Sequence, residues 1–261
     1  MPSEGQRTAF REFVRRRAEG TPVAYLVGRR EFYSLSFRGT PDVLIPRPET
    51  ELLVVATLDL VKEKGAEARG PGAGGQSEPP TSNPQSLIPN PSIADIGTGS
   101  GIIAVCLAKH LPGSRVTAVD ISPAALAIAR DNAKQHGLAD RIECVESDLF
   151  AAVPADERFD FVVSNPPYVT AAEFEQLAPD VKKFEPHGAL VAGPKGTEVI
   201  ERLIPQAAER LRPGGRLLME ISPMIHDAVQ SLLEADNRFE LGPTIKDLAR
   251  LPRVVQARKR D

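Results

Sequence analysis

Apolar and polar positions follow two alternating patterns along most of the chain. From residue 93 onward, short apolar runs are separated by longer segments whose apolar residues recur at helical spacing. The runs predict strands at 93–96, 116–119, 142–145, 159–163 and 216–221, and the segments between them predict helices at 102–110, 123–136, 198–211 and 225–235. This alternation is typical of βαβ units, so we expect a Rossmann-like α/β fold with a mostly parallel, twisted sheet.

The two ends of the chain carry different patterns. Residues 8–18 place phenylalanines on one stripe and arginines on the other, which predicts a helix. Residues 32–37 alternate apolar with small or polar side chains and predict a strand, and residues 52–61 predict an apolar helix. From Phe239 onward we expect a terminal hairpin that closes with residues 253–257 and adds an antiparallel strand to the sheet.

Residues 65–92 differ from the rest in composition. They hold five Gly and six Pro with almost no large apolar side chains. A segment of this kind cannot bury enough apolar surface to offset the entropy of ordering, so we expect a flexible linker.

Composition narrows the class of protein. The chain has 261 residues, 41% of them hydrophobic and 26% charged, which suits one large soluble domain with a small appendage. Its net charge of -3 disfavours general binding to nucleic acid. Two cysteines without CxxC spacing, and the lack of an export signal or a membrane-length apolar run, indicate a cytoplasmic protein. Four scattered histidines give no metal-ligand spacing, so we expect no metal site.

A glycine-rich run with the sequence DIGTGSG, residues 95–101, closes the first expected strand of the sheet and opens a helix. Such a turn lets a ligand approach the backbone and the N–H groups at the start of the helix. Its G-x-G-x-G spacing departs from the G-x-G-x-x-G of dinucleotide folds and favours the amino-acid end of S-adenosylmethionine. Asp120 ends the next strand, where a carboxylate can bind ribose hydroxyls, and Asp148 with Leu149 ends the third, beside the expected adenine.

The sequence SNPPY, residues 164–168, follows the fourth expected strand. Because proline fixes φ and cannot donate, the carbonyl of Pro166 is a rigid acceptor, and the side-chain oxygen of Asn165 is a second one. Together they can hold both hydrogens of a planar NH₂ group, against which Tyr168 packs. Accepting these hydrogens returns electron density to a weakly nucleophilic nitrogen and aims it at a methyl donor. We expect water to take the proton that leaves. Adenine N6, guanine N2 and a glutamine amide all fit this loop.

The motifs LIPRPETE (44–51), DIGTGSG, SNPPY and DLARLPRVV (247–255), with residues 20–32, resemble the release-factor glutamine methyltransferases. The resemblance implies a class I S-adenosylmethionine methyltransferase fold. It also implies N5-methylation of the glutamine amide in the Gly-Gly-Gln motif of class 1 peptide chain release factors. The implied cofactor-binding residues are Gly97, Thr98, Gly99, Ser100, Gly101, Asp120, Leu149 and Asn165, to which we add Asp148 from its place in the sequence. Asn165, Pro166, Pro167 and Tyr168 are the implied catalytic residues, which hold the substrate glutamine.

The resemblance divides the chain into four parts. Residues 1–43 match a shortened N-terminal helix and hairpin that we interpret as the remnant of a substrate-recognition domain. Residues 44–64 are the PRPETE segment with its helix, 65–92 the linker and 93–261 the methyltransferase domain. Two departures from the family pattern are Lys195, where an aspartate is common, and the run that starts at Glu220, where E-I-G-x-x-Q is usual.

Several alternatives stay open from the sequence. The acceptor could be a glutamine of a ribosomal protein, an exocyclic amine of a nucleic-acid base, or none, if the protein binds cofactor without activity. We expect a monomer whose partner is a release factor and which binds neither membrane nor nucleic acid directly. Gln76 completes a Gly-Gly-Gln triplet in the linker, which raises the hypothesis of a pseudosubstrate or automethylation site in cis.

Overall fold

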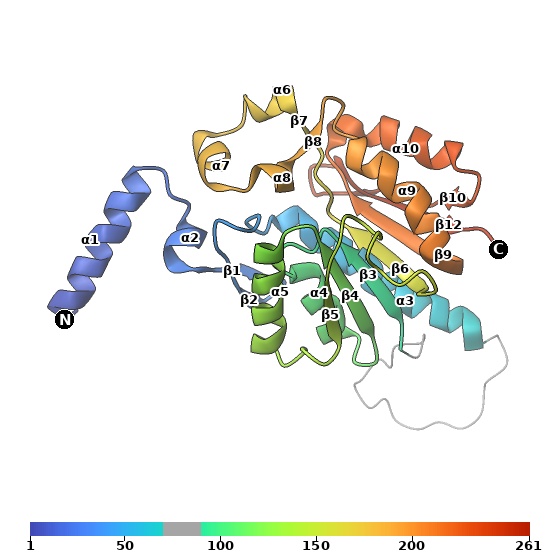
Figure 1. Cartoon of the computed structure of the whole chain (residues 1–261), viewed down its shortest axis with the longest axis horizontal. Helices are drawn as coiled ribbons and strands as arrows, with labels where there is room; N and C mark the ends of the chain where they lie inside the picture. The colour runs from blue at the N-terminus through green and yellow to red at the C-terminus, as the bar shows by residue number, and fades with distance from the viewer. Residues whose placement is uncertain (70–89) are drawn as a thin grey trace.

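The computed structural model describes residues 1–69 and 90–261 (Figure 1). Gln76 and its triplet lie outside the described residues.

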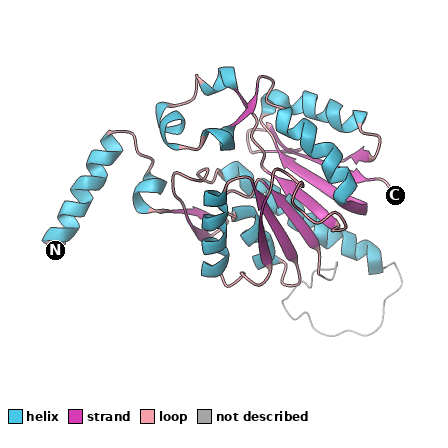
Figure 2. Ribbon diagram, in the orientation of Figure 1, coloured by secondary structure: helices cyan, strands magenta, loops and turns pink. Residues whose placement is uncertain are grey.

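A mixed eight-stranded sheet forms the centre of the molecule (Figure 2). Seven strands follow the order β10-β12-β9-β6-β3-β4-β5, and β11 pairs with β12. Their bounds are β3 Ser92–Ile96, β4 Arg115–Asp120, β5 Ile142–Glu146, β6 Phe159–Ser164, β9 Leu211–Glu220, β10 Phe239–Leu241, β11 Ile245–Lys246 and β12 Pro252–Lys259. The strands from β5 to β9 are parallel, and β12 lies antiparallel between β9 and β10. The predicted fold class and the inserted antiparallel strand are confirmed.

Helices cover both faces of this sheet (Figure 1). Alternating side chains of β6 separate the two cores: Phe161 and Val163 join the core under one set of helices, and Val162 joins the other. The first set is α3 Glu51–Arg69, α4 Ile102–His110 and α5 Pro123–Gln135, and the second is α9 Glu198–Arg210 and α10 His226–Ala235. The Ser122 hydroxyl accepts a hydrogen bond from the Ala125 amide and so caps α5, as the sequence predicts.

The N-terminal elements precede the sheet in the order α1 Glu4–Ala18, α2 Val23–Val27, β1 Arg29–Phe32 and β2 Leu35–Arg38. Helix α1 buries no residue and projects away from the body (Figure 1). The prediction of a single strand over residues 32–37 is wrong. Tyr33 and Ser34 adopt positive φ angles of 49° and 57° and turn the chain into an antiparallel hairpin. Without a glycine at either position, the sequence carries no signal for this turn.

Two further boundaries differ from the prediction. Helix α3 continues to Arg69, into the segment expected to be a linker. Strand β9 begins at Leu211, earlier than the strand predicted at 216–221, so the Pro-Gly-Gly run at residues 213–215 lies within it. The pairing of β9 with β6 is irregular at this point, which accommodates the proline.

A small layer that the sequence analysis does not predict lies beyond the end of β6 (Figure 1). It consists of β7 Val169–Thr170, α6 Ala171–Phe174, α7 Pro179–Phe184, α8 His187–Leu190 and β8 Val191–Gly193. These elements are too short to leave a periodic pattern in the sequence. In the described part of the chain, no helix is long and apolar enough to cross a membrane.

Candidate active site

A cavity of about 460 Å³ opens at the carboxyl ends of β3, β4 and β6. Open α/β sheets bind ligands at this edge, where the order of strands reverses direction. Most of the predicted site residues line it: Gly97, Thr98, Gly99, Ser100, Asp120, Asp148, Leu149, Asn165 and Pro167. Gly101, Pro166 and Tyr168 are not among its lining residues, although each is adjacent in sequence to one that is.

The glycine turn at the end of β3 depends on backbone conformations that other residues avoid. Gly97, Gly99 and Gly101 have φ angles of +73°, +54° and +78°. The amides of Gly97 and Thr98 both donate to the carbonyl of Val119 at 2.8 Å, which ties the turn to β4. These bonds fix the shape of the turn against the cavity.

Asp95 is a structural residue of this turn that the sequence analysis does not assign. It is fully buried, and its Oδ2 accepts from the Thr98 hydroxyl at 2.6 Å and from the Ala104 amide at 3.1 Å. Burial raises the pKa of Asp95 to about 7, despite these two hydrogen bonds. The carboxyl therefore holds the turn to the first residues of α4.

Asp120 lies at the end of β4, next to the glycine turn. Its Oδ2 accepts from the Gly99 amide at 2.8 Å, and its Oδ1 accepts from the Ser122 amide at 2.9 Å. Burial raises the pKa of Asp120, and these backbone hydrogen bonds partly oppose the shift. Ile121, which the sequence analysis does not single out, also lines the cavity and is 69% exposed. A carboxylate beside an exposed apolar side chain can bind a ligand ring through both groups: the carboxylate contacts its polar substituents, and the apolar side chain contacts its apolar face.

The end of β5, the third strand in sequence order among the parallel strands, brings Asp148 and Leu149 to the cavity, as predicted from the sequence. Asp148 forms an ion pair of 2.5 Å with Arg202 of α9, another lining residue that the sequence does not indicate. Leu149 has a positive φ of 51°, which is unfavourable for a residue with a Cβ. Strain of this kind persists where the surrounding structure enforces it and is common at ligand sites.

The SNPPY loop leaves β6 at the cavity wall. Asn165 donates from Nδ2 to the Thr50 hydroxyl at 3.2 Å, so its Oδ1 is the end of the amide that is free to accept. Ser164 anchors the base of the loop by donating to the Ile96 carbonyl at 2.6 Å. Tyr168 donates its phenol to Glu220 Oε1 at 3.4 Å, and burial raises the pKa of the phenol well above its ordinary value.

The PRPETE segment supplies the wall that faces this loop. Arg47 forms an ion pair of 2.7 Å with Glu185, whose side chain is 2% exposed. The same carboxylate accepts from the Ile45 amide at 3.2 Å. Thr50, in the short helix Pro48–Thr50, reaches Asn165 from the same segment. The sequence marks this segment as a family motif, but only the fold brings it next to a loop more than a hundred residues away.

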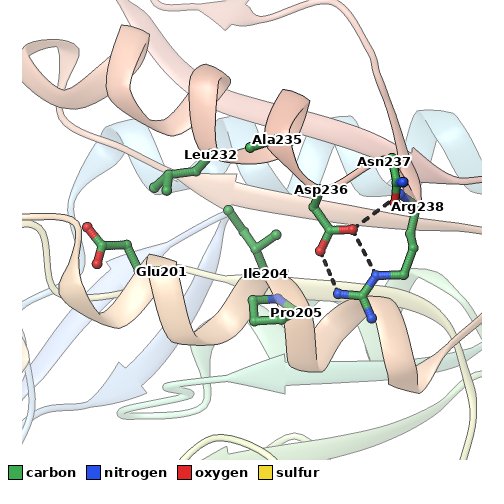
Figure 3. Close-up of a pocket in the computed structure, with 8 residues that line it drawn as sticks. All are labelled: Glu201, Ile204, Pro205, Leu232, Ala235, Asp236, Asn237 and Arg238. Carbon is green, nitrogen blue, oxygen red and sulfur yellow. Dashed lines mark hydrogen bonds and ion pairs between the residues drawn. The ribbon is translucent and has the colours of Figure 1, made fainter.

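A second hollow lies between α9 and α10 and holds about 380 Å³ (Figure 3). Its charged groups already have partners: Asp236 forms an ion pair of 2.6 Å with Arg238, and Glu201 accepts from Thr197 at 2.8 Å. It therefore presents no converging set of free polar groups. Within residues 1–69 and 90–261, no group of acidic, histidine or cysteine side chains is placed to hold a metal ion.

Comparison with known proteins relates this geometry to a family. Residues 84–181 match the family model "Methyltransferase small domain". The release factor glutamine methyltransferase of Rhodopirellula baltica is 46% identical over 259 residues, which is 99% of this chain and 81% of that relative. The chain belongs to the release factor glutamine methyltransferase family. Its counterpart from Koribacter versatilis is 41% identical over 97% of this chain and 80% of its own length.

Solved structures agree with the family's fold. The hMettl16 catalytic domain, solved with an RNA hairpin from the MAT2A 3′UTR, superposes with a TM-score of 0.61 at 19% identity. The match covers 88% of this chain and 77% of that one. At this level of identity the likeness shows the methyltransferase fold alone. The resemblance found from the four sequence motifs is confirmed by the curated relatives of this family.

Proposed function

We propose that this protein transfers a methyl group from S-adenosylmethionine to the side-chain amide nitrogen of the glutamine in the Gly-Gly-Gln motif of class 1 peptide chain release factors. The orientation of Asn165 carries the proposal. Thr50 holds the nitrogen end of the Asn165 amide, which leaves the oxygen as an acceptor on the wall of the cavity formed by the glycine turn. An acceptor at that place suits a planar NH₂ group.

The residues of the cavity fit S-adenosylmethionine. Three positive φ angles at Gly97, Gly99 and Gly101 leave room for a ligand against the backbone, where a Cβ would be strained. Asp120 would hold the ribose hydroxyls, Ile121 and Leu149 would flank the adenine, and Asp148 lies beside them. When bound, this cofactor supplies an electrophilic methyl group on a sulfonium.

The catalytic loop acts on the acceptor amide. Asn165 Oδ1 and the carbonyl of Pro166 would accept the two hydrogens of the substrate NH₂, and the ring of Tyr168 would pack against its plane. Accepting both hydrogens favours the tetrahedral geometry of nitrogen and directs its lone pair toward the methyl donor. The proton lost from nitrogen leaves to water in this proposal.

A protein substrate is favoured over nucleic acid by the net charge of -3 and by the names of the curated relatives. The proposal includes a monomeric enzyme that recognises a release factor directly, without a nucleic-acid partner. Size-exclusion chromatography with light-scattering detection, on the protein alone and on its mixture with a release factor, tests the stoichiometry.

The deciding experiment combines the protein with methyl-labelled S-adenosylmethionine and a purified class 1 release factor, followed by peptide mapping. We expect one label, on the Gly-Gly-Gln glutamine, and none on a release factor in which that glutamine is alanine. Ribosomal proteins and total RNA are tested as methyl acceptors in parallel reactions in the same buffer. Label in either of these with none in the release factor would assign the loop to a different acceptor.

A further inference from the structure

A buried carboxylate lies behind the catalytic loop. Glu220 is the last residue of β9 and is 2% exposed. Its Oε1 accepts from the Tyr168 phenol at 3.4 Å, whereas Oε2 is buried and makes no close hydrogen bond within the described residues. Burying a carboxyl oxygen without a hydrogen bond costs free energy, unless a further group donates to it.

Thr50 connects this carboxylate to Asn165. The Thr50 side chain is buried with its residue 1% exposed, and its hydroxyl accepts from Asn165 Nδ2 at 3.2 Å. Since a hydroxyl has one proton to donate, the Thr50 proton must go to a group other than Asn165. The Thr50 hydroxyl lies close enough to the Glu220 carboxylate to favour the charged form of that acid. The unassigned proton of Thr50 and the unpaired Oε2 of Glu220 thus belong to one buried cluster, in which Asn165 donates to Thr50 and Tyr168 donates to Glu220.

Charged groups on three elements bear on Glu220. Burial, together with the nearby Glu49, raises the pKa of Glu220 to about 7. Arg253, at the start of β12, lowers it, as do the hydroxyls of Thr50 and Tyr168. Arg253 is itself held by an ion pair of 2.8 Å with Asp247. The positive charge of Arg253 is thus shared with a second acid and forms no ion pair with Glu220 among the described residues.

We propose that Glu220 is a positioning residue for the methyl-transfer reaction: its carboxylate holds the Thr50 hydroxyl and the Tyr168 phenol, and through them fixes the direction of the Asn165 amide and the ring of Tyr168. The inference rests on the proposed function, because it assigns Glu220 a part in that reaction. Glu220 touches neither substrate nor cofactor. It decides which end of the Asn165 amide faces the cavity, since a Thr50 hydroxyl that donates to Glu220 can only accept from Asn165.

Kinetic variants test the positioning role. Glu220→Ala should lower kcat for a release factor about tenfold or more, the effect of losing one well-placed hydrogen bond, and leave the Kd for S-adenosylmethionine within about twofold. Glu220→Gln, which keeps one acceptor oxygen, should recover part of that loss. Thr50→Val should behave like Glu220→Ala, whereas Thr57→Val, a buried hydroxyl of α3 bonded to the Leu53 carbonyl, should keep wild-type kcat. Because part of its effect acts through Asn165, Glu220→Ala should lower kcat by a smaller factor in an Asn165→Ala background than in the wild type, and the remaining loss acts through Tyr168.

A spectroscopic readout makes the network testable without catalysis. The Asn165 side-chain amide, assigned by its loss in Asn165→Ser, should shift in the ¹⁵N NMR spectrum as pH passes through about 7, and the shift should vanish in Glu220→Gln and in Thr50→Val. Wild-type kcat in Glu220→Ala, or an Asn165 amide that ignores both variants, would overturn the proposal. If the wild-type enzyme methylates no release factor, the proposed function fails while the NMR titration still decides the network.

Discussion

At the scale of single residues, Asn165 has the most specific assignment. Its Nδ2 is used by Thr50, and its Oδ1 is the proposed acceptor for the substrate NH₂. Asn165→Ala removes that acceptor and should lower the rate of methyl transfer about 100- to 1,000-fold, by analogy with the loss of one donor from an oxyanion hole. Affinity for S-adenosylmethionine, measured by calorimetry, should fall far less. Near-normal turnover in the variant would remove Asn165 from the mechanism.

Asp95 predicts a pH dependence of stability. Because burial raises its pKa from 3.8 to about 7, the folded protein binds an extra proton between those values. Its contribution to stability is therefore complete at low pH and is lost as pH rises toward 7. Asp95→Asn cannot titrate, so the difference in unfolding free energy between variant and wild type should change by about 2 kcal/mol from pH 5 to pH 8, in favour of the variant. Urea unfolding at both pH values measures it, and a difference independent of pH would contradict the assignment.

At the scale of elements, Gly101 joins the glycine turn to the packing of α4 against α5. A Cβ at this position would lie 3.1 Å from the Ala129 Cβ and 3.2 Å from its Cα. Gly101→Ala should cost about 1 kcal/mol for the positive φ and a further 1–3 kcal/mol for overpacking, and should weaken S-adenosylmethionine binding.

Gly137→Ala is the matched control for this change. Gly137 has a similar φ of +70°, but a Cβ there meets nothing within 4 Å. We expect it to lose only the backbone contribution of about 1 kcal/mol and to keep its cofactor affinity. Urea unfolding and calorimetry of the two variants separate strain from packing. Equal losses in both would mean that the close approach of Ala129 does not constrain Gly101.

Elements with a strong local signal are the ones that the sequence predicts well. Helix 102–110 agrees with α4 at both ends, and the strands at 93–96 and 116–119 lie within β3 and β4. The hairpin over residues 32–37 could not be predicted, because its turn uses Tyr33 and Ser34 at positive φ in place of glycine. The small layer from β7 to β8 escapes prediction because tertiary contacts, not periodicity, hold such short elements.

At the scale of the whole molecule, sequence order predicts the strand-end residues of the cavity, but not the residues that reach it from elsewhere. Asp120 ends one strand and Asp148 follows another, and parallel strands end at a common edge, so their convergence can be inferred. Thr50 and Arg202 arrive through the packing of distant segments. Thr50 belongs to the PRPETE motif, but nothing in the sequence shows that it meets Asn165, and no local pattern distinguishes Arg202 from other polar side chains. Glu220 has an ordinary place at a strand end, and only its burial identifies it.

The contact between the PRPETE segment and Glu185 joins two segments that lie far apart in the sequence, and it gives the last prediction. Glu185→Ala leaves the Arg47 guanidinium and the Ile45 amide without this carboxylate at the cavity wall. Fully buried pairs lose 3–5 kcal/mol on such a change. Because Arg47 is 34% exposed, water screens part of its charge, and we expect about 2–3 kcal/mol with weaker S-adenosylmethionine binding. Asp131→Ala is the control, since its pair with Arg38 also joins distant segments but is 52% exposed on both sides and should contribute under about 1 kcal/mol. Urea unfolding and calorimetry compare the two variants. If Glu185→Ala loses no more stability than Asp131→Ala and binds the cofactor normally, the cavity wall does not depend on this ion pair.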